Sequence, residues 1–219
     1  MPNTRTEQLA GMLRFYSPLI SDTMERLGIA STALHHSIQQ TFTDPSLKVC
    51  GVAFPCRVAA TDQYVEITTL LQMVDAIPEE AFVVVAADSN VDAALWGGMM
   101  SARAQARGAV AAVVNGGVRD LEQIASLQFP VFGTGRCIKD IRRRGYMAAF
   151  NTQVVMDGVP IRPGDIVFGD ANGVIVIPQE RFDEIYAELD RACAEEAATH
   201  RGLTSGEGAQ KLFQEYGRF

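Results

Sequence analysis

The chain has 219 residues, of which 47% are hydrophobic and 21% are charged, and these values are ordinary for one globular domain. Its formal net charge of −7 at pH 7 argues against nucleic acid as a partner, because nucleic-acid-binding proteins concentrate Lys and Arg on one face. No apolar run approaches the roughly 18 residues of a spanning helix, so no membrane partner is expected either.

Two short helices are predicted near the start of the chain, over residues 6–15 and 21–27. Asp22, with Glu25 three positions later, resembles a capping box at a helix start, and Gly28 is a suitable stop. We therefore interpret Asp22 as a helix cap rather than as a catalytic residue.

The next segment, residues 32–46, is polar and irregular and contains His35 and His36. Adjacent side chains point in different directions in a helix or a strand, so these two make a poor pair of metal ligands. His200 is the third and last histidine, and a histidine-based zinc site is therefore not expected.

Strand composition is found in residues 49–60, where Pro55 favours an edge strand or a bulge. Residues 64–73 are compatible with a helix. The run AFVVVAA at 81–87 is the clearest buried strand, and the turn-forming residues 88–90 end it.

Gly97 and Gly98 stand directly before a run of good helix formers, residues 99–107, which Gly108 ends. A double glycine lets a ligand approach the backbone closely, and the first-turn amides of a helix have no partner of their own. The segment from Gly97 to Met100 is therefore predicted to bind an anion.

A second buried strand is predicted over residues 109–114, which residues 115–117 (NGG) end. Arg119 and Asp120 follow where the chain leaves the sheet, the edge at which open sheets bind ligands. Arg119 offers a forked cation for a carboxylate, and Asp120 a hard oxygen ligand for a divalent ion. An ordinary pair of surface charges is the alternative.

The remainder of the chain predicts a short helix over residues 120–126 and four strands over residues 129–132, 148–156, 166–168 and 174–177. Two closing helices are predicted over residues 178–196 and 209–216. Asp157-Gly158 is a strong hairpin signal. The three arginines at 142–144 are interpreted as a helix end rather than an RNA site. Asp165 and Asp170 lie beside glycines in turns, so both are interpreted as structural.

The four cysteines, Cys50, Cys56, Cys137 and Cys193, form no C-x-x-C pair. The N-terminal residues have neither the pattern of a signal peptide nor that of a spanning helix. A cytoplasmic protein with free thiols is therefore expected. The alternation of helices with short buried strands, without a repeat or linker, predicts one α/β domain.

Three segments of the chain resemble the RraA-like family: GGMMS at 97–101 with NGGVRD at 115–120, ISDTMERLG at 20–28, and RPGD at 162–165 with DANGV at 170–174. This family includes class II pyruvate aldolases acting on 4-hydroxy-4-methyl-2-oxoglutarate or 4-carboxy-4-hydroxy-2-oxoadipate, and a regulator of ribonuclease activity. The resemblance implies a layered α/β/β/α swivelling-domain fold over residues 1–219. It also implies homotrimers or homohexamers with the active site at a subunit interface, and residues 179–219 are expected to contribute to the contacts.

The resemblance further implies a reaction and a site. The reaction is divalent-metal-dependent cleavage of a 4-hydroxy-2-oxo acid to pyruvate through an enolate, with decarboxylation of oxaloacetate at the same site. Asp120 would bind Mg²⁺ or Mn²⁺, and Arg119 would hold the substrate and stabilise its enolate oxygen. The substrate carboxylate would meet the amides of Gly97, Gly98, Met99 and Met100.

The chain departs from the aldolase pattern at Gly98, because characterised aldolases resemble G-(D/E)-L-L and carry there an acidic residue that would orient metal-bound water. Asn115, where Asp is common, is a second departure. A carboxylate from a neighbouring subunit, near Glu195 and Glu196, is one possible replacement. Two other functions stay open: a non-catalytic regulator that binds a ribonuclease, and a lyase acting on another oxo or sugar acid.

Overall fold

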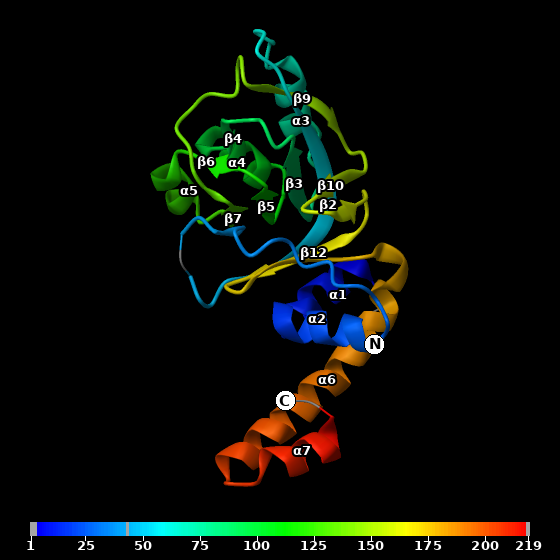
Figure 1. Cartoon of the computed structure of the whole chain (residues 1–219). Helices are drawn as coiled ribbons and strands as arrows, with labels where there is room; N and C mark the ends of the chain where they lie inside the picture. The colour runs from blue at the N-terminus through cyan, green and yellow to red at the C-terminus, as the bar shows by residue number, and fades with distance from the viewer. Residues whose placement is uncertain (1–3, 43, 218–219) are drawn as a thin grey trace.

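The computed structural model describes residues 4–42 and 44–217 (Figure 1). Within them a curled, eight-stranded sheet has the order β1-β7-β5-β3-β2-β12-β13, with β9 also pairing on β2. Its strands are β1 (Gln39–Gln40), β2 (Lys48–Ala60), β3 (Ala81–Ala87), β5 (Ala111–Val114), β7 (Val131–Gly133), β9 (Gly145–Phe150), β12 (Ile166–Asp170) and β13 (Gly173–Ile177). Strands β2, β3, β5 and β7 run parallel, whereas the others pair antiparallel.

Two smaller sheets and a set of helices complete the described structure. The small sheets are β4 (Ala94–Trp96) with β6 (Gly117–Val118) and β8 (Gly135–Arg136), and β10 (Val154–Met156) with β11 (Val159–Ile161). The helices are α1 (Arg5–Met12), α2 (Ser17–Arg26), α3 (Thr68–Ala76), α4 (Gly98–Ala106), α5 (Leu121–Leu127), α6 (Phe182–Thr204) and α7 (Ala209–Tyr216), with a 3-10 turn at Gln179–Arg181.

Successive side chains of the buried strands point to opposite faces of the sheet, and a separate layer packs on each face. On β3, Val83 and Val85 pack with α3, α4 and α5, whereas Phe82 and Val84 pack against the β10–β11 hairpin and the inner face of β12 and β13. The outer face of β12 and β13, which includes Phe168, packs against α1, α2 and α6. This order confirms the layered α/β/β/α fold that the resemblance implied.

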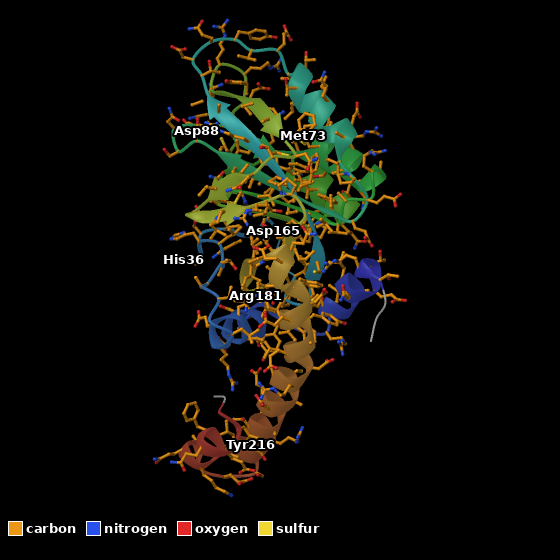
Figure 2. All side chains as sticks on the ribbon, turned by 90° about the vertical axis from the view of Figure 1, so that its right-hand side faces the viewer. His36, Met73, Asp88, Asp165, Arg181 and Tyr216 are labelled. Atoms are coloured by element: carbon orange, nitrogen blue, oxygen red, sulfur yellow. The ribbon has the colours of Figure 1, made fainter. Side chains whose placement is uncertain are left out.

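Helices α6 and α7 extend away from the sheets as an arm (Figure 1). Figure 2 shows Tyr216 of α7 on this arm, far from Met73 of α3 in the body of the molecule. Within the described residues, no helix combines the length and apolarity that crossing a membrane requires.

The edge position predicted for residues 49–60 is wrong, because β2 lies inside the sheet. It pairs with β3 on one side, and on the other side with β12 over its first half and β9 over its second half. Pro55 lies between these two partners, where the missing amide hydrogen interrupts no ladder on that side. The predicted irregularity is real, since the β2–β9 register shifts between Arg57 and Val58.

The helix start predicted at Asp22 is also wrong. Helix α2 begins at Ser17, so Asp22 lies inside the helix. The start is fixed from far along the chain, because the Asp170 carboxylate accepts hydrogen bonds from the Ser17 amide (2.8 Å) and hydroxyl (2.7 Å). The structural role predicted for Asp170 is thereby confirmed.

Of three other local predictions, two are confirmed and one is wrong. Asp165 accepts hydrogen bonds from the amides of Arg162 (2.7 Å) and Gln179 (3.0 Å), as expected for a structural aspartate. Asp157 and Gly158 both have positive φ and form the predicted hairpin turn. The arginines at 142–144 lie in a turn before β9 rather than at a helix end, so that prediction is wrong.

A candidate active site at the start of helix α4

A cleft of about 630 Å³ opens beside the start of α4. Its walls come mainly from α3, α4, the β4 strand and the residues that follow β6. The described residues that line it are Ile67, Leu70, Leu71, Val74, Asp75, Ala94, Leu95, Trp96, Gly97, Met99, Met100, Arg103, Arg119, Asp120, Gln123 and Ile141. The cleft therefore has an apolar lining with a few polar groups, the usual character of a small-molecule site.

Pairing between β4 and β6 brings the two predicted motifs together. Trp96 is the register partner of Val118, and the Arg119 amide donates to the Trp96 carbonyl at 3.1 Å. Gly97, directly after Trp96, is the N-cap of α4. The glycine segment and the Arg119-Asp120 pair consequently lie side by side, as the prediction of one site requires.

Ser101 anchors the glycine segment from inside the protein. The buried indole of Trp96 donates to the Ser101 hydroxyl at 2.8 Å, and this hydroxyl donates to the Gly97 carbonyl at 3.1 Å. Trp96 also stacks on Phe129, with ring centroids 6.4 Å apart. The start of α4 is thus fixed by buried contacts, and the first-turn amides of Met99 and Met100 have no preceding helical carbonyl to bind.

Asp120 has a strained backbone. Its φ of 57° and ψ of 40° place it in the left-handed region, which costs an L-residue roughly 1–2 kcal/mol. Its Oδ2 accepts a hydrogen bond from the Gly98 amide at 3.2 Å and lies 3.6 Å from Nε of Arg119. Strain of this kind persists where surrounding contacts impose it and is concentrated at functional sites.

Gly97 is required by the position of this carboxylate. A Cβ atom at Gly97 would lie 2.8 Å from Oδ2 of Asp120 and 3.2 Å from Cγ of Arg119. The glycine therefore permits close approach rather than an unusual φ, since its backbone is extended. Met99, whose side chain is 87% exposed, and Met100 continue the cleft wall.

Arg119 has a second acidic neighbour, Asp140, which was not predicted from the sequence. The Nη1 atom of Arg119 lies 3.7 Å from Oδ2 of Asp140. The other carboxylate oxygen of Asp140 accepts hydrogen bonds from the amide (2.8 Å) and Nε (3.0 Å) of Arg142. The hydrogen bonds from Arg142, with the nearby Arg119 charge, lower the pKa of Asp140 to about 2. No local motif marks Asp140, because it reaches Arg119 only through the pairing of β6 with β8.

Gln123 explains the departure at Gly98. A Cβ atom at Gly98 would lie 2.1 Å from Oε1 of Gln123 and 2.8 Å from its Cβ. The space that any side chain at Gly98 would enter is therefore filled from α5. The sequence offered only the spacing of Asp120 and Gln123, which resembles a helix cap.

The second departure, Asn115, closes the end of β3. Its carboxamide accepts from the Ala87 amide at 2.7 Å and donates to the Ala87 carbonyl at 3.0 Å. An ionised aspartate has no hydrogen for that carbonyl, so asparagine is the residue that satisfies both groups.

Two other candidate carboxylates lie away from the cleft within one chain. Glu195 is on α6, where it contacts Arg26 of α2 and Arg191. Glu196 accepts a hydrogen bond from Tyr16, and burial, followed by this hydrogen bond, raises the pKa of Tyr16. Among the described residues, no group of three or more His, Cys, Asp or Glu side chains is arranged to hold a metal ion. All four cysteines are free.

Comparisons with known proteins agree with this architecture. The chain is 28% identical over 217 residues to protein DlpA of Legionella pneumophila, covering 99% of this chain but 34% of DlpA, so it spans about a third of that relative's length. It is 30% identical over 168 residues to a Halalkalibacterium halodurans protein named as a candidate 4-hydroxy-4-methyl-2-oxoglutarate aldolase, covering 77% of this chain and 78% of that protein.

A solved structure has the same fold. Streptomyces coelicolor RraAS2, described as an unusual member of the RNase ES inhibitor RraA family, superimposes with a TM-score of 0.76 at 22% identity, covering 90% of this chain and 98% of RraAS2. The model of the family described as Aldolase/RraA matches residues 17–176, which include every segment of the cleft. The chain therefore belongs to the RraA-like family.

Proposed function

We propose that the protein is a divalent-metal-dependent carbon–carbon lyase that forms the enolate of pyruvate from 2-oxo acids. Its substrates would be 4-hydroxy-2-oxo acids of the 4-hydroxy-4-methyl-2-oxoglutarate type, and oxaloacetate. The observation that carries this proposal is the strained Asp120 beside Arg119, both facing a cleft at the start of α4. The name of the Halalkalibacterium halodurans relative supports the same reaction.

The chain's own groups suit the pyruvyl end of such a substrate. The amides of Met99 and Met100, with the positive end of the α4 dipole, would bind the carboxylate. The Arg119 guanidinium would bind the C2 oxygen and stabilise the negative charge that develops there. Asp140 would keep Arg119 oriented toward the cleft.

A divalent cation fits the donor set. The side chain of Asp120 is 37% exposed in the cleft, and its contacts with Gly98 and Arg119 are long enough to leave the carboxylate available as a ligand. Mg²⁺ characteristically uses one or two carboxylates and keeps water and substrate oxygens as its other ligands. When bound, Mg²⁺ or Mn²⁺ would supply a Lewis acid at the C2 oxygen.

The test is pyruvate release from oxaloacetate and from 4-hydroxy-4-methyl-2-oxoglutarate, with Mg²⁺ or Mn²⁺ and again with a chelator. The variant Asp120→Asn removes the charge but keeps a residue type that tolerates the left-handed conformation. Because loss of a group that only supports a metal ligand costs about 10 to 100-fold, we expect loss of the ligand to lower release at least about 100-fold. Undiminished release by folded Asp120→Asn protein would refute the assignment.

We also propose assembly as a homotrimer or homohexamer in the cytoplasm. The α6–α7 arm extends from the body (Figure 1) and exposes Phe213, which is 54% accessible. Light scattering on the whole chain would measure the mass of the assembly, and a monomer would contradict this expectation.

A further inference from the structure

The cleft beside the start of α4 continues as a groove between α3 and α4, which pack against each other. The N-terminal ends of the two helices both border the cleft, through the N-cap residues Ile67 of α3 and Gly97 of α4. Farther along, Nε of Arg103 on α4 binds the Asp75 carboxylate of α3 at 2.8 Å. The groove therefore runs from the Asp120 end of the cleft to this ion pair.

The α3 wall of this groove is an apolar stripe. Ile67, Leu70, Leu71 and Val74 all line the cleft, and their spacing places them on one face of the helix. Val74 is 8% exposed and belongs to the core, whereas Leu71 is 52% exposed. The stripe therefore leads from the core out into the open cleft, where it offers an apolar surface to part of a ligand.

The charges of the cleft are divided between its two ends. Among the described residues that line it, Arg119 and Asp120 lie at the α4 start, and Asp75 and Arg103 lie at the far end. Arg103 is six residues after Gly97, which is about 9 Å along the helix axis. Because Asp75 and Arg103 neutralise each other, the far end carries no net positive charge to attract a second carboxylate of a substrate.

The substituent on C4 takes no part in the bond changes of retro-aldol cleavage. The C3–C4 bond breaks, its electron pair moves into the enolate, and C4 becomes the carbonyl carbon of an aldehyde or ketone. The C4 hydroxyl releases its proton to water, and water returns a proton to C3 when the enolate becomes pyruvate. The groups that contact the C4 substituent therefore select the substrate without changing the reaction.

Resting on the proposed function, we propose that the preferred substrates are 4-hydroxy-2-oxo acids that carry an apolar chain or ring on C4 in place of a second carboxylate. The pyruvyl end binds at the α4 start, and the apolar substituent lies along α3 against Leu70 and Leu71. Leu71 is the specificity-determining residue, because it is the most exposed member of the stripe. 4-Hydroxy-4-methyl-2-oxoglutarate, which has a carboxylate on C4, is a slower substrate of the same site.

The test measures metal-dependent pyruvate release from a homologous series, 4-hydroxy-2-oxopentanoate to 4-hydroxy-2-oxooctanoate, in which the C4 substituent grows from methyl to butyl. Burial of one methylene group favours binding by about 4-fold. We therefore expect kcat/KM to rise at least about 10-fold from the methyl to the butyl acid. The butyl acid should also exceed 4-hydroxy-2-oxoglutarate, which has a carboxylate in place of the chain.

Two variants test the α3 wall. Leu71→Gln keeps a side chain of similar size but makes it polar, and it should lower the butyl-to-methyl ratio of kcat/KM at least about 3-fold. The matched control is Leu13→Gln, which changes a 42% exposed leucine at the end of α1, outside the cleft, and should leave the ratio unchanged. Partial loss of folding lowers every rate together and leaves the ratio intact.

Three outcomes would overturn this inference. The first is a kcat/KM that does not depend on chain length. The second is a preference for 4-hydroxy-2-oxoglutarate that Arg103→Met abolishes, because Arg103 would then bind a second carboxylate. The third is a Leu71→Gln protein with an unchanged ratio and a smaller assembly by light scattering, because the stripe would then be a contact between subunits.

The same assays keep the two proposals apart. Metal-dependent pyruvate release from oxaloacetate or 4-hydroxy-4-methyl-2-oxoglutarate leaves the proposed function standing in each of these three cases. Absence of metal-dependent release from every substrate overturns the proposed function, and the inference with it.

Discussion

Removing the hydroxyl of Ser101 tests whether a buried contact holds the start of α4 in place. Ser101 is 0% exposed and Trp96 is 1% exposed, so water does not replace the bond that Ser101→Ala removes. An indole N–H left without an acceptor costs about 1–3 kcal/mol. The better helix propensity of alanine returns at most about 0.5 kcal/mol. We therefore expect the free energy of unfolding to fall by about 0.5–2.5 kcal/mol.

Urea unfolding followed by fluorescence measures this change, because Trp96 is the only tryptophan of the chain. With a slope of about 2 kcal/mol/M, the midpoint should fall by about 0.25–1.25 M while the slope itself stays the same. The matched control is Ser126→Ala, which removes an exposed hydroxyl that donates to the Glu122 carbonyl, and it should change stability by less than about 0.5 kcal/mol. Equal midpoints for the two variants would refute this account of the Ser101 contact.

Two other predictions concern the carboxylates around Arg119. Gly97→Ala places a methyl group 2.8 Å from Oδ2 of Asp120, so this carboxylate should be displaced. The affinity of the protein for Mn²⁺, measured by titration, should then fall about 10 to 100-fold. An unchanged affinity would argue against Asp120 as the metal ligand. The folded-state pKa of Asp140, about 2, lies below its ordinary value, so its stabilising contribution is present above about pH 4 and is lost as the pH falls toward 2. Urea midpoints of wild type and Asp140→Asn should therefore differ at pH 6, and the difference should shrink progressively as the pH falls from about 4 toward 2. A constant difference would contradict this origin.

Local patterns were enough to predict the buried strands. The apolar run at Ala81–Ala87 is a strand from its first residue to its last, because burial on both faces leaves few other structures for such a run. Gly97, Arg119 and Asp120 were also recognised by residue type and by resemblance. That they lie in one cleft follows from the pairing of β4 with β6, two strands too short to carry a sequence pattern.

What the sequence could not reveal depends on partners distant along the chain. Asp22 has every local feature of a helix cap, yet the α2 start is set by Asp170, 153 positions after Ser17. Gln123 likewise matches a capping box, but its side chain packs over Gly98 of another helix. Local sequence patterns predict hydrogen bonds between residues close in the chain. Such predictions fail where the same side chain contacts a residue distant in the sequence instead.

The contact between Gly98 and Gln123 also constrains how this sequence can evolve. A side chain acquired first at position 98 would collide with the glutamine, whereas a smaller residue acquired first at position 123 would leave both helices intact. A change from glycine to an acidic residue at position 98 is therefore expected to come second, after a small residue has replaced Gln123. The intermediate sequence would have small residues at both positions. Related sequences should accordingly show the two positions changing together, with a bulky pair absent from the lineage.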